Sequence, residues 1–188
     1  MKKIFFYSAV ALLFSCNNKS RGPDVSDIRV ELAMERFEKD FFSVDTNNLV
    51  TGVQNLHNRY PSFTPVFLYG VLGLPDSSAI LYTELKRFLS LNRSIYADVE
   101  KRYRSTDDIK KDLEKAFQHV KYYFPNYPLP KKIITLVGPI DAMAQMANGG
   151  YTPNFLGKDF LGISLQFYLG AELVLYLATI DQKSIDVN

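Results

Sequence analysis

The chain has 188 residues, of which 47% are hydrophobic, 14% aromatic and 22% charged. This composition is typical of one globular domain, and it excludes a disordered, collagen-like or multi-span membrane protein. The formal net charge is +2, from 22 basic and 20 acidic residues. Lys2 and Lys3 lie in the predicted signal peptide, and without them the basic and acidic residues are equal in number. A neutral chain gives no electrostatic reason to expect a nucleic-acid partner.

The first sixteen residues have the three-part layout of an export signal. Lys2 and Lys3 precede an apolar run over residues 4–14, and Ser15 and Cys16 follow it. A helix that spans a membrane needs roughly 20 apolar residues, so this run is too short to span. We therefore predict a signal peptide over residues 1–15, a lipidated, flexible tether over residues 16–27, and a single globular domain over residues 28–188.

Cys16 is the only cysteine, which excludes a disulfide framework and any multi-cysteine metal site. Residues 13–16 (Leu-Phe-Ser-Cys) resemble a bacterial lipobox, in which the cysteine is acylated and becomes the new N-terminus. Two or more acyl chains hold a protein stably at a membrane. Cys16 is thus the predicted lipidation site, carrying palmitate-type chains, and membrane lipid is a predicted partner. The alternative is a buried free cysteine in a core helix.

Helical spacing of apolar residues dominates the first two-thirds of the chain. Alternation at Ile28, Val30 and Leu32 predicts a short strand there, and helical spacing begins at Met34. Further helices are predicted from residue 49 to Pro61, over 65–73, from the cap at 76–78, from 94, and from 105 to 124. On the helix after residue 78, the predicted inner face consists of Ile80, Leu81, Leu85, Phe88 and Leu89.

Strand patterns appear in the last third of the chain. Apolar runs over 132–138 and 161–168 predict two strands of one sheet, and Gly149-Gly150 marks a turn between them. The predicted fold class is α+β, predominantly helical with a small antiparallel or mixed sheet in the last third.

The sequence holds no recognisable catalytic motif. His57 and His119 lie in different predicted helices, and neither begins the H-E-x-x-H motif of a zinc hydrolase, so a structural histidine is expected at position 119. A G-x-S-x-G nucleophile elbow and glycine-rich phosphate loops are also missing from the sequence. We therefore predict no catalytic residue, no metal ligand and no cofactor, and a protein that is not an enzyme.

The aromatic run over residues 122–128 (Tyr-Tyr-Phe-Pro-Asn-Tyr-Pro) has two interpretations. Its aromatics could form a binding surface. The favoured interpretation is a helix end with aromatics in the core, because proline ends helices in any case.

Five segments together resemble the gliding-motility lipoprotein GldB family of Bacteroidetes. They are the lipobox ending at Cys16 and residues 35–45, 59–63, 116–138 and 161–170. The resemblance implies an outer-membrane lipoprotein, needed for movement on surfaces and linked to the type IX secretion machinery, with partners among envelope proteins of that machinery. Only Cys16 is carried over as a site residue. With no acidic cluster after Cys16, the periplasmic face of the outer membrane is expected.

The resemblance also implies an early C-terminal end, because family members continue with helical sequence after the segment that ends at Gly170. The apolar stretch over residues 173–180 is then expected to leave apolar surface exposed. The alternative function is a membrane-anchored zinc-peptidase-like protein or its inactive remnant. The metal-binding helix of such a protein would lie beyond residue 170.

Overall fold

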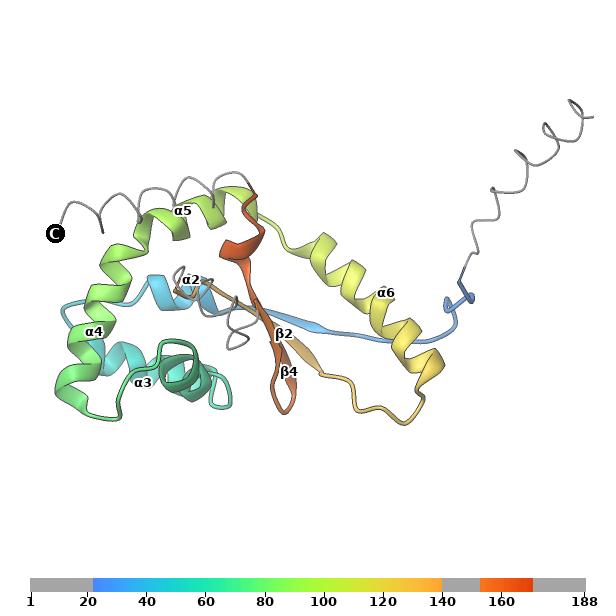
Figure 1. Cartoon of the computed structure of the whole chain (residues 1–188), viewed down its shortest axis with the longest axis horizontal. Coiled ribbons are helices and arrows are strands. Elements are labelled where there is room, and N and C mark those ends of the chain that lie inside the picture. The colour runs from blue at the N-terminus through green and yellow to red at the C-terminus, as the bar shows by residue number, and fades with distance from the viewer. Residues whose placement is uncertain (1–21, 140–152, 171–188) are drawn as a thin grey trace, which may run out of the picture.

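The computed structural model describes residues 22–139 and 153–170, in which helices surround a small sheet (Figure 1). The helices are α2 (Phe37–Phe42), α3 (Leu49–Arg59), the π-helix η2 (Val66–Val71), α4 (Ser78–Leu91), α5 (Arg93–Arg102), α6 (Asp107–Tyr123) and the 3₁₀-helix η3 (Leu165–Tyr168). The strands are β1 (Ala33–Arg36), β2 (Lys132–Leu136), β3 (Asn154–Leu156) and β4 (Phe160–Ser164). The signal peptide, Cys16, the Gly149-Gly150 turn and residues 173–180 lie outside the described residues.

The four strands form one mixed sheet in the order β1-β2-β4-β3. β1, β2 and β4 are parallel, with Ile134 opposite both Glu35 and Gly162, and β3 pairs antiparallel with β4. The two apolar runs predicted from the sequence are thus neighbours in the sheet. The predicted α+β class, helical with a small mixed sheet, is confirmed.

The first strand lies later in the chain than predicted. Residues 28–32 are not a strand, and β1 occupies Ala33–Arg36, where a helix was expected to begin. The reason is a competition for backbone partners. Ile28 O accepts a hydrogen bond from Gln118 Nε2 at 2.8 Å and Leu32 N donates to Glu114 Oε1 at 3.0 Å, so α6 side chains bind this segment. Only from Ala33 onward does the backbone pair with β2.

An aromatic core joins the sheet to helices α2 and α3 and to η2. Phe37 has no exposed surface, and its ring centroid lies 4.7–5.6 Å from four other rings. Those four rings are Phe41, Tyr60, Phe63 and Phe67. Helix α2 has six residues, of which four are buried, so its position is set by this core rather than by helix propensity.

Helix α6 lies differently, at the far side of the sheet from α3 and α4 (Figure 1). None of its 17 residues, all of which the structure describes, is buried. Ile109, Leu113 and Phe117 from the predicted stripe are partly buried against the core, but Phe124 is 62% exposed. The favoured interpretation of residues 122–128 as core aromatics is therefore wrong.

Two smaller expectations also fail. Ile80 is 53% exposed, because the buried face of α4 is centred on Leu81, Leu85 and Leu89. The alternation through residue 168 does not continue as a strand, since β4 ends at Ser164 and the chain turns into η3. In η3 the apolar side chain of Leu165 still enters the core, which explains why the pattern looked continuous.

Candidate functional site

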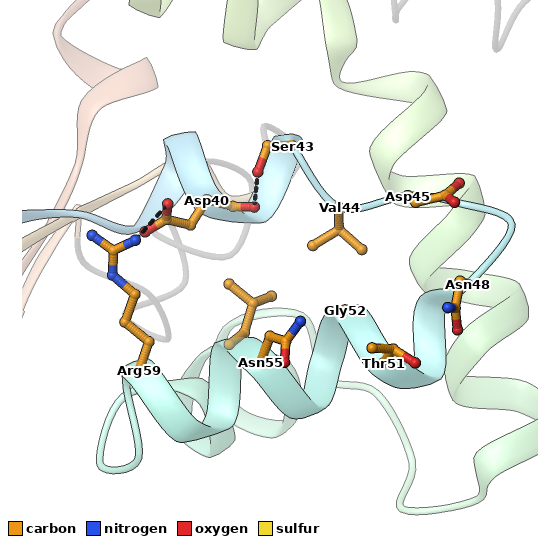
Figure 2. Close-up of a pocket in the computed structure, with 10 residues that line it drawn as sticks. Asp40, Ser43, Val44, Asp45, Asn48, Thr51, Gly52, Asn55 and Arg59 are labelled. Carbon is orange, nitrogen blue, oxygen red and sulfur yellow. Dashed lines mark hydrogen bonds and ion pairs between the residues drawn. The ribbon is translucent and has the colours of Figure 1, made fainter.

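Polar side chains gather in a hollow of about 330 Å³ between the end of α2 and helix α3 (Figure 2). The side chains that give it polar character are Asp40, Ser43, Asp45, Asn48, Thr51, Asn55 and Arg59. The chain between α2 and α3 passes close to α3 at Gly52. A Cβ at that position would come within 2.2 Å of Val44 Cγ1, so only glycine fits without displacement of Val44.

The carboxylate of Asp40 is already engaged at the end of this hollow. It accepts a hydrogen bond from Arg59 NH1 at 3.0 Å and another from the hydroxyl of Tyr60. Burial, and then the hydrogen bond to Asp40, raises the pKa of the Tyr60 hydroxyl. Tyr60 therefore stays protonated and acts as a donor, and Asp40 is a hydrogen-bond acceptor that ties α2 to α3.

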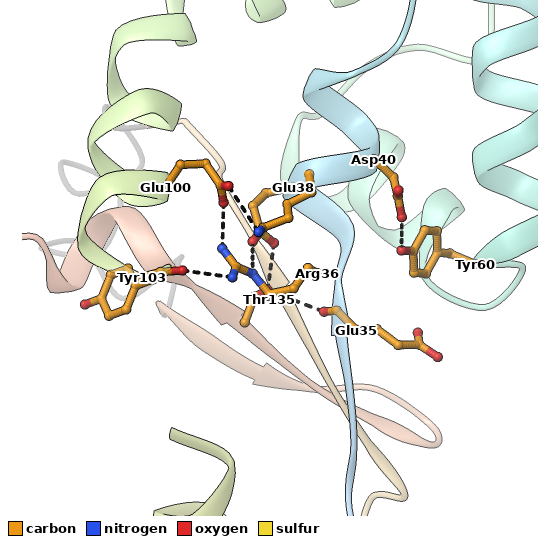
Figure 3. A network of polar contacts seen from close by, with 9 residues as sticks. Glu35, Arg36, Glu38, Asp40, Tyr60, Glu100, Tyr103 and Thr135 are labelled. Atoms are coloured by element: carbon orange, nitrogen blue, oxygen red, sulfur yellow. Dashed lines mark hydrogen bonds and ion pairs between the residues drawn. The ribbon is translucent and has the colours of Figure 1, made fainter. Parts of the chain in front are cut away.

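A second polar group lies where the parallel strands end (Figure 3). Arg36 is the last residue of β1, and its guanidinium donates to Tyr103 O at 2.9 Å, to Glu100 Oε1 at 2.7 Å and, through Nε, to Glu38 Oε1. The other carboxylate oxygen of Glu38 accepts from Thr135 Oγ1 at 2.7 Å. This charged cluster joins β1, β2, α2 and α5.

The side chain of Glu38 has no exposed surface, whereas that of Arg36 is 15% exposed. Burial raises the pKa of the Glu38 carboxyl, and the positive charge of Arg36 opposes that rise. A carboxyl with a raised pKa is a candidate acid or base in a cleft, but here both oxygens are bonded within the protein and neither reaches solvent. The geometry is that of a structural ion pair.

Two buried polar groups lack hydrogen-bond partners among the described residues. They are Glu35 Oε2 on β1 and the whole side-chain amide of Gln166, which is fully buried in η3 just after β4. Each unpaired buried group costs roughly 1–3 kcal/mol of folding stability. Glu35 is near the end of parallel strand β1, and Gln166 directly follows parallel strand β4. Ligands of parallel sheets bind at the edge where the strands end.

The family described as gliding motility protein GldB matches the chain over residues 18–185. The chain belongs to the GldB family. This membership associates it with gliding motility and with lipoproteins of the cell envelope. Comparison with curated proteins and comparison with solved structures give no significant match.

The structure does not bring together the residues weighed as metal ligands. His57 is exposed on α3, and His119 is half-buried on α6, with its Cε1 3.8 Å from where a Cβ on Gly22 would stand. Across residues 22–139 and 153–170, no three His, Cys, Asp or Glu side chains converge in a way that could hold a metal ion. Within those same ranges no helix has both the length and the apolarity required to cross a bilayer.

The sequence interpretation missed the charged cluster of this GldB-family chain. A signal for Glu38 was present, because it stands three and four positions before Phe41 and Phe42 and therefore shares their buried helix face. No local signal points to Thr135, which lies 97 positions from Glu38 in the chain. Such a partner is found only once the pairing of β1 with β2 is known.

Proposed function

We propose that this chain is a non-catalytic accessory lipoprotein of the gliding-motility machinery and the type IX secretion apparatus linked to it. It is held by an acylated Cys16 in the outer membrane and faces the periplasm. The observation that carries the proposal is the family match over residues 18–185, nearly the whole chain after the predicted signal peptide.

The mechanism is confinement of an interaction domain to the membrane plane. The predicted tether ends at residue 27, eleven residues after Cys16. So short a connection keeps the domain at the surface, where its effective concentration toward other membrane-bound components is high. Because no reaction is invoked, the function depends on the position and the surface of the domain.

The polar groups of the domain support a non-catalytic role. Glu38 is paired with Arg36 and Thr135 out of reach of solvent, and Asp40 is held by Arg59 and Tyr60. Each oxygen of these two carboxylates accepts a hydrogen bond from within the protein, and such bonds tie neighbouring elements of the fold together.

Gene deletion and complementation test the proposal. The deletion should abolish colony spreading and lower the amount of secreted surface adhesin, and the native gene should restore both. Cys16→Ser should fail to restore spreading, because the domain is no longer anchored. Asp40→Asn tests for catalysis by this carboxylate, because it removes the charge in the hollow but keeps an acceptor oxygen for Tyr60 or Arg59. It should restore spreading.

Three results would contradict the proposal. They are normal spreading of the deletion strain, full complementation by Cys16→Ser with no acyl label, and cleavage of peptides by the purified protein with stoichiometric zinc. The last would instead favour a peptidase.

A further inference from the structure

Exposed aromatic side chains cluster at the C-terminal end of α6. Tyr122, Tyr123, Phe124 and Tyr127, here called the aromatic tip, are 49%, 59%, 62% and 51% exposed. The rings of Tyr122 and Tyr123 meet edge to face with centroids 5.0 Å apart. A hydrogen bond of 3.0 Å from Tyr127 N to Phe124 O closes the turn that follows the helix. Four large aromatic side chains are therefore exposed within six consecutive positions.

Such clustering differs from the scattered exposure of single apolar residues, which is normal on a protein surface. Elsewhere in the described chain the exposed large hydrophobic residues are single, as Val50, Ile80 and Leu91 are, apart from the pair Val66 and Tyr69 on η2. A contiguous apolar patch indicates a surface that another phase or molecule covers. The aromatic tip is the strongest such patch among the described residues.

The chemistry of the tip is suited to a lipid headgroup layer. Tyrosine has an apolar ring with a polar end and is enriched where membranes meet water. From Lys115 to Pro139 the sequence has four lysines and no acidic residue, and exposed Lys121 and Lys131 precede and follow the tip along the chain. Exposed Asp24 and Asp27 lie on the neighbouring N-terminal segment and offset part of this charge. The rings therefore contribute more than the lysines.

The N-terminal segment, residues 22–32, connects the predicted anchor at Cys16 with the neighbourhood of the aromatic tip. Followed backward along the chain, the segment bonds to Glu114 through Leu32 and to Gln118 through Ile28, and then passes His119 at Gly22. It therefore runs along α6 toward the aromatic tip, as Figure 1 shows. Cys16 is six residues before Gly22, and six residues reach at most about 20 Å.

We propose that the aromatic tip docks on the headgroup layer of the same membrane that holds Cys16. The acyl chains and the tip then form two points of attachment, which fix the orientation of the domain. In that orientation α6 is at the membrane, and the end formed by α3 and α4 extends away from it (Figure 1). This inference rests on the acylation of Cys16 in the proposed function and adds to it a specific lipid-facing surface.

A tryptophan reporter tests the inference, because the chain has no tryptophan of its own. Full-length acylated protein with Tyr123→Trp is reconstituted in vesicles of phosphatidylethanolamine and phosphatidylglycerol with brominated acyl chains. The matched control is Tyr69→Trp, a tyrosine 44% exposed on η2 beside α3. We expect blue-shifted emission and about two-fold quenching at position 123, since interfacial side chains reach the acyl boundary, and no quenching at position 69.

Mass spectrometry of the N-terminal peptide separates failure of the inference from failure of the proposed function. If Cys16 is acylated and the tryptophan at position 123 is unquenched, the inference is overturned and the anchor stands. Equal quenching at both positions also overturns it, because no particular face is then at the membrane. If Cys16 carries no acyl chain, the anchor fails and the inference fails with it.

A protein partner is the competing occupant of the tip. A photo-crosslinker at position 124 that captures a protein, while position 123 is unquenched, would overturn membrane docking. Phe124→Trp provides a second reporter in case Tyr123→Trp does not fold, and the same quenching is expected of it.

Discussion

The core around α2 and the end of α6 use the same aromatic residues in opposite ways. Around Phe37, rings from α2, from η2 and from the turn between α3 and η2 are buried against one another. At the end of α6, Tyr123 and Phe124 are more than half exposed, and no residue of that helix is buried. The first set stabilises the fold, and the second is available to contact something outside the chain.

The difference shows that aromatic composition alone does not tell a core from a surface. Both regions have phenylalanine and tyrosine at short spacing, and both lie beside charged residues. What separates them is the sheet, because α2 directly follows β1, whereas α6 extends beyond the strands to the N-terminal segment.

Removal of the Phe37 ring should have the largest effect on stability. Phe37→Ala leaves a cavity among four other rings and should lower the free energy of unfolding by about 3–5 kcal/mol. Chemical denaturation measures the change. Phe124→Ala is the matched control, and an equal loss in both variants would show that the tip is not a surface.

Loss of the Arg36 side chain should have the next largest effect on the free energy of unfolding. Arg36→Ala leaves Glu38 buried without its cation and should cost about 3 kcal/mol. Lys39→Ala removes a cation that is 41% exposed and contacts Glu100 at 3.2 Å, and it should cost no more than about 1 kcal/mol. If the two variants were equally stable, the cluster would not have the structural role assigned to it.

The raised pKa of Glu38 predicts that the free energy of unfolding depends on pH, with a smaller change than the one expected for Arg36→Ala. The folded state holds this proton at higher pH than the unfolded state, whose ordinary value is 4.5. Folding stability must then fall as pH rises from about 4.5 through the raised value, and level off above it. Denaturation of native protein and of Glu38→Gln over a pH series should show the native protein losing stability relative to the variant in that window. A constant difference between the two would contradict the raised pKa.

The smallest effect on stability is expected at the aromatic tip. Tyr123→Ser combined with Phe124→Ser removes exposed rings and should change the free energy of unfolding by no more than about 0.5 kcal/mol. Denaturation midpoints of the native and double-substituted proteins measure this. A loss of several kcal/mol would show that the two rings are part of the core.

The elements of this fold that depend on local spacing were predictable from sequence. Helix α3 ends before Pro61 as expected, and the runs that form β2 and β4 were identified as strands of one sheet. The position of β1 was not predictable, because it depends on pairing with Lys132 about a hundred residues later. The exposure of Phe124 was hidden for the same reason, since it depends on where α6 lies against the sheet.

The candidate site was predictable only in part. The spacing of Glu38 relative to Phe41 and Phe42 indicates burial, and a buried carboxylate requires a partner. The identity of that partner depends on tertiary structure, since Arg36 is near in sequence while Glu100 and Thr135 are distant. The hollow beside Asp40 had no sequence signal apart from Gly52, whose close approach to Val44 becomes visible only in three dimensions.

Colony spreading of a strain whose gene carries Tyr123→Ser and Phe124→Ser tests most directly whether the aromatic tip serves the function of the domain. A strain with Leu91→Ser, which removes a side chain 66% exposed on α4, is the control. We predict that the control spreads like the native strain, and that the double variant spreads less at equal protein level and with equal acylation of Cys16. Full spreading of the double variant would contradict the claim that this surface serves the function of the domain.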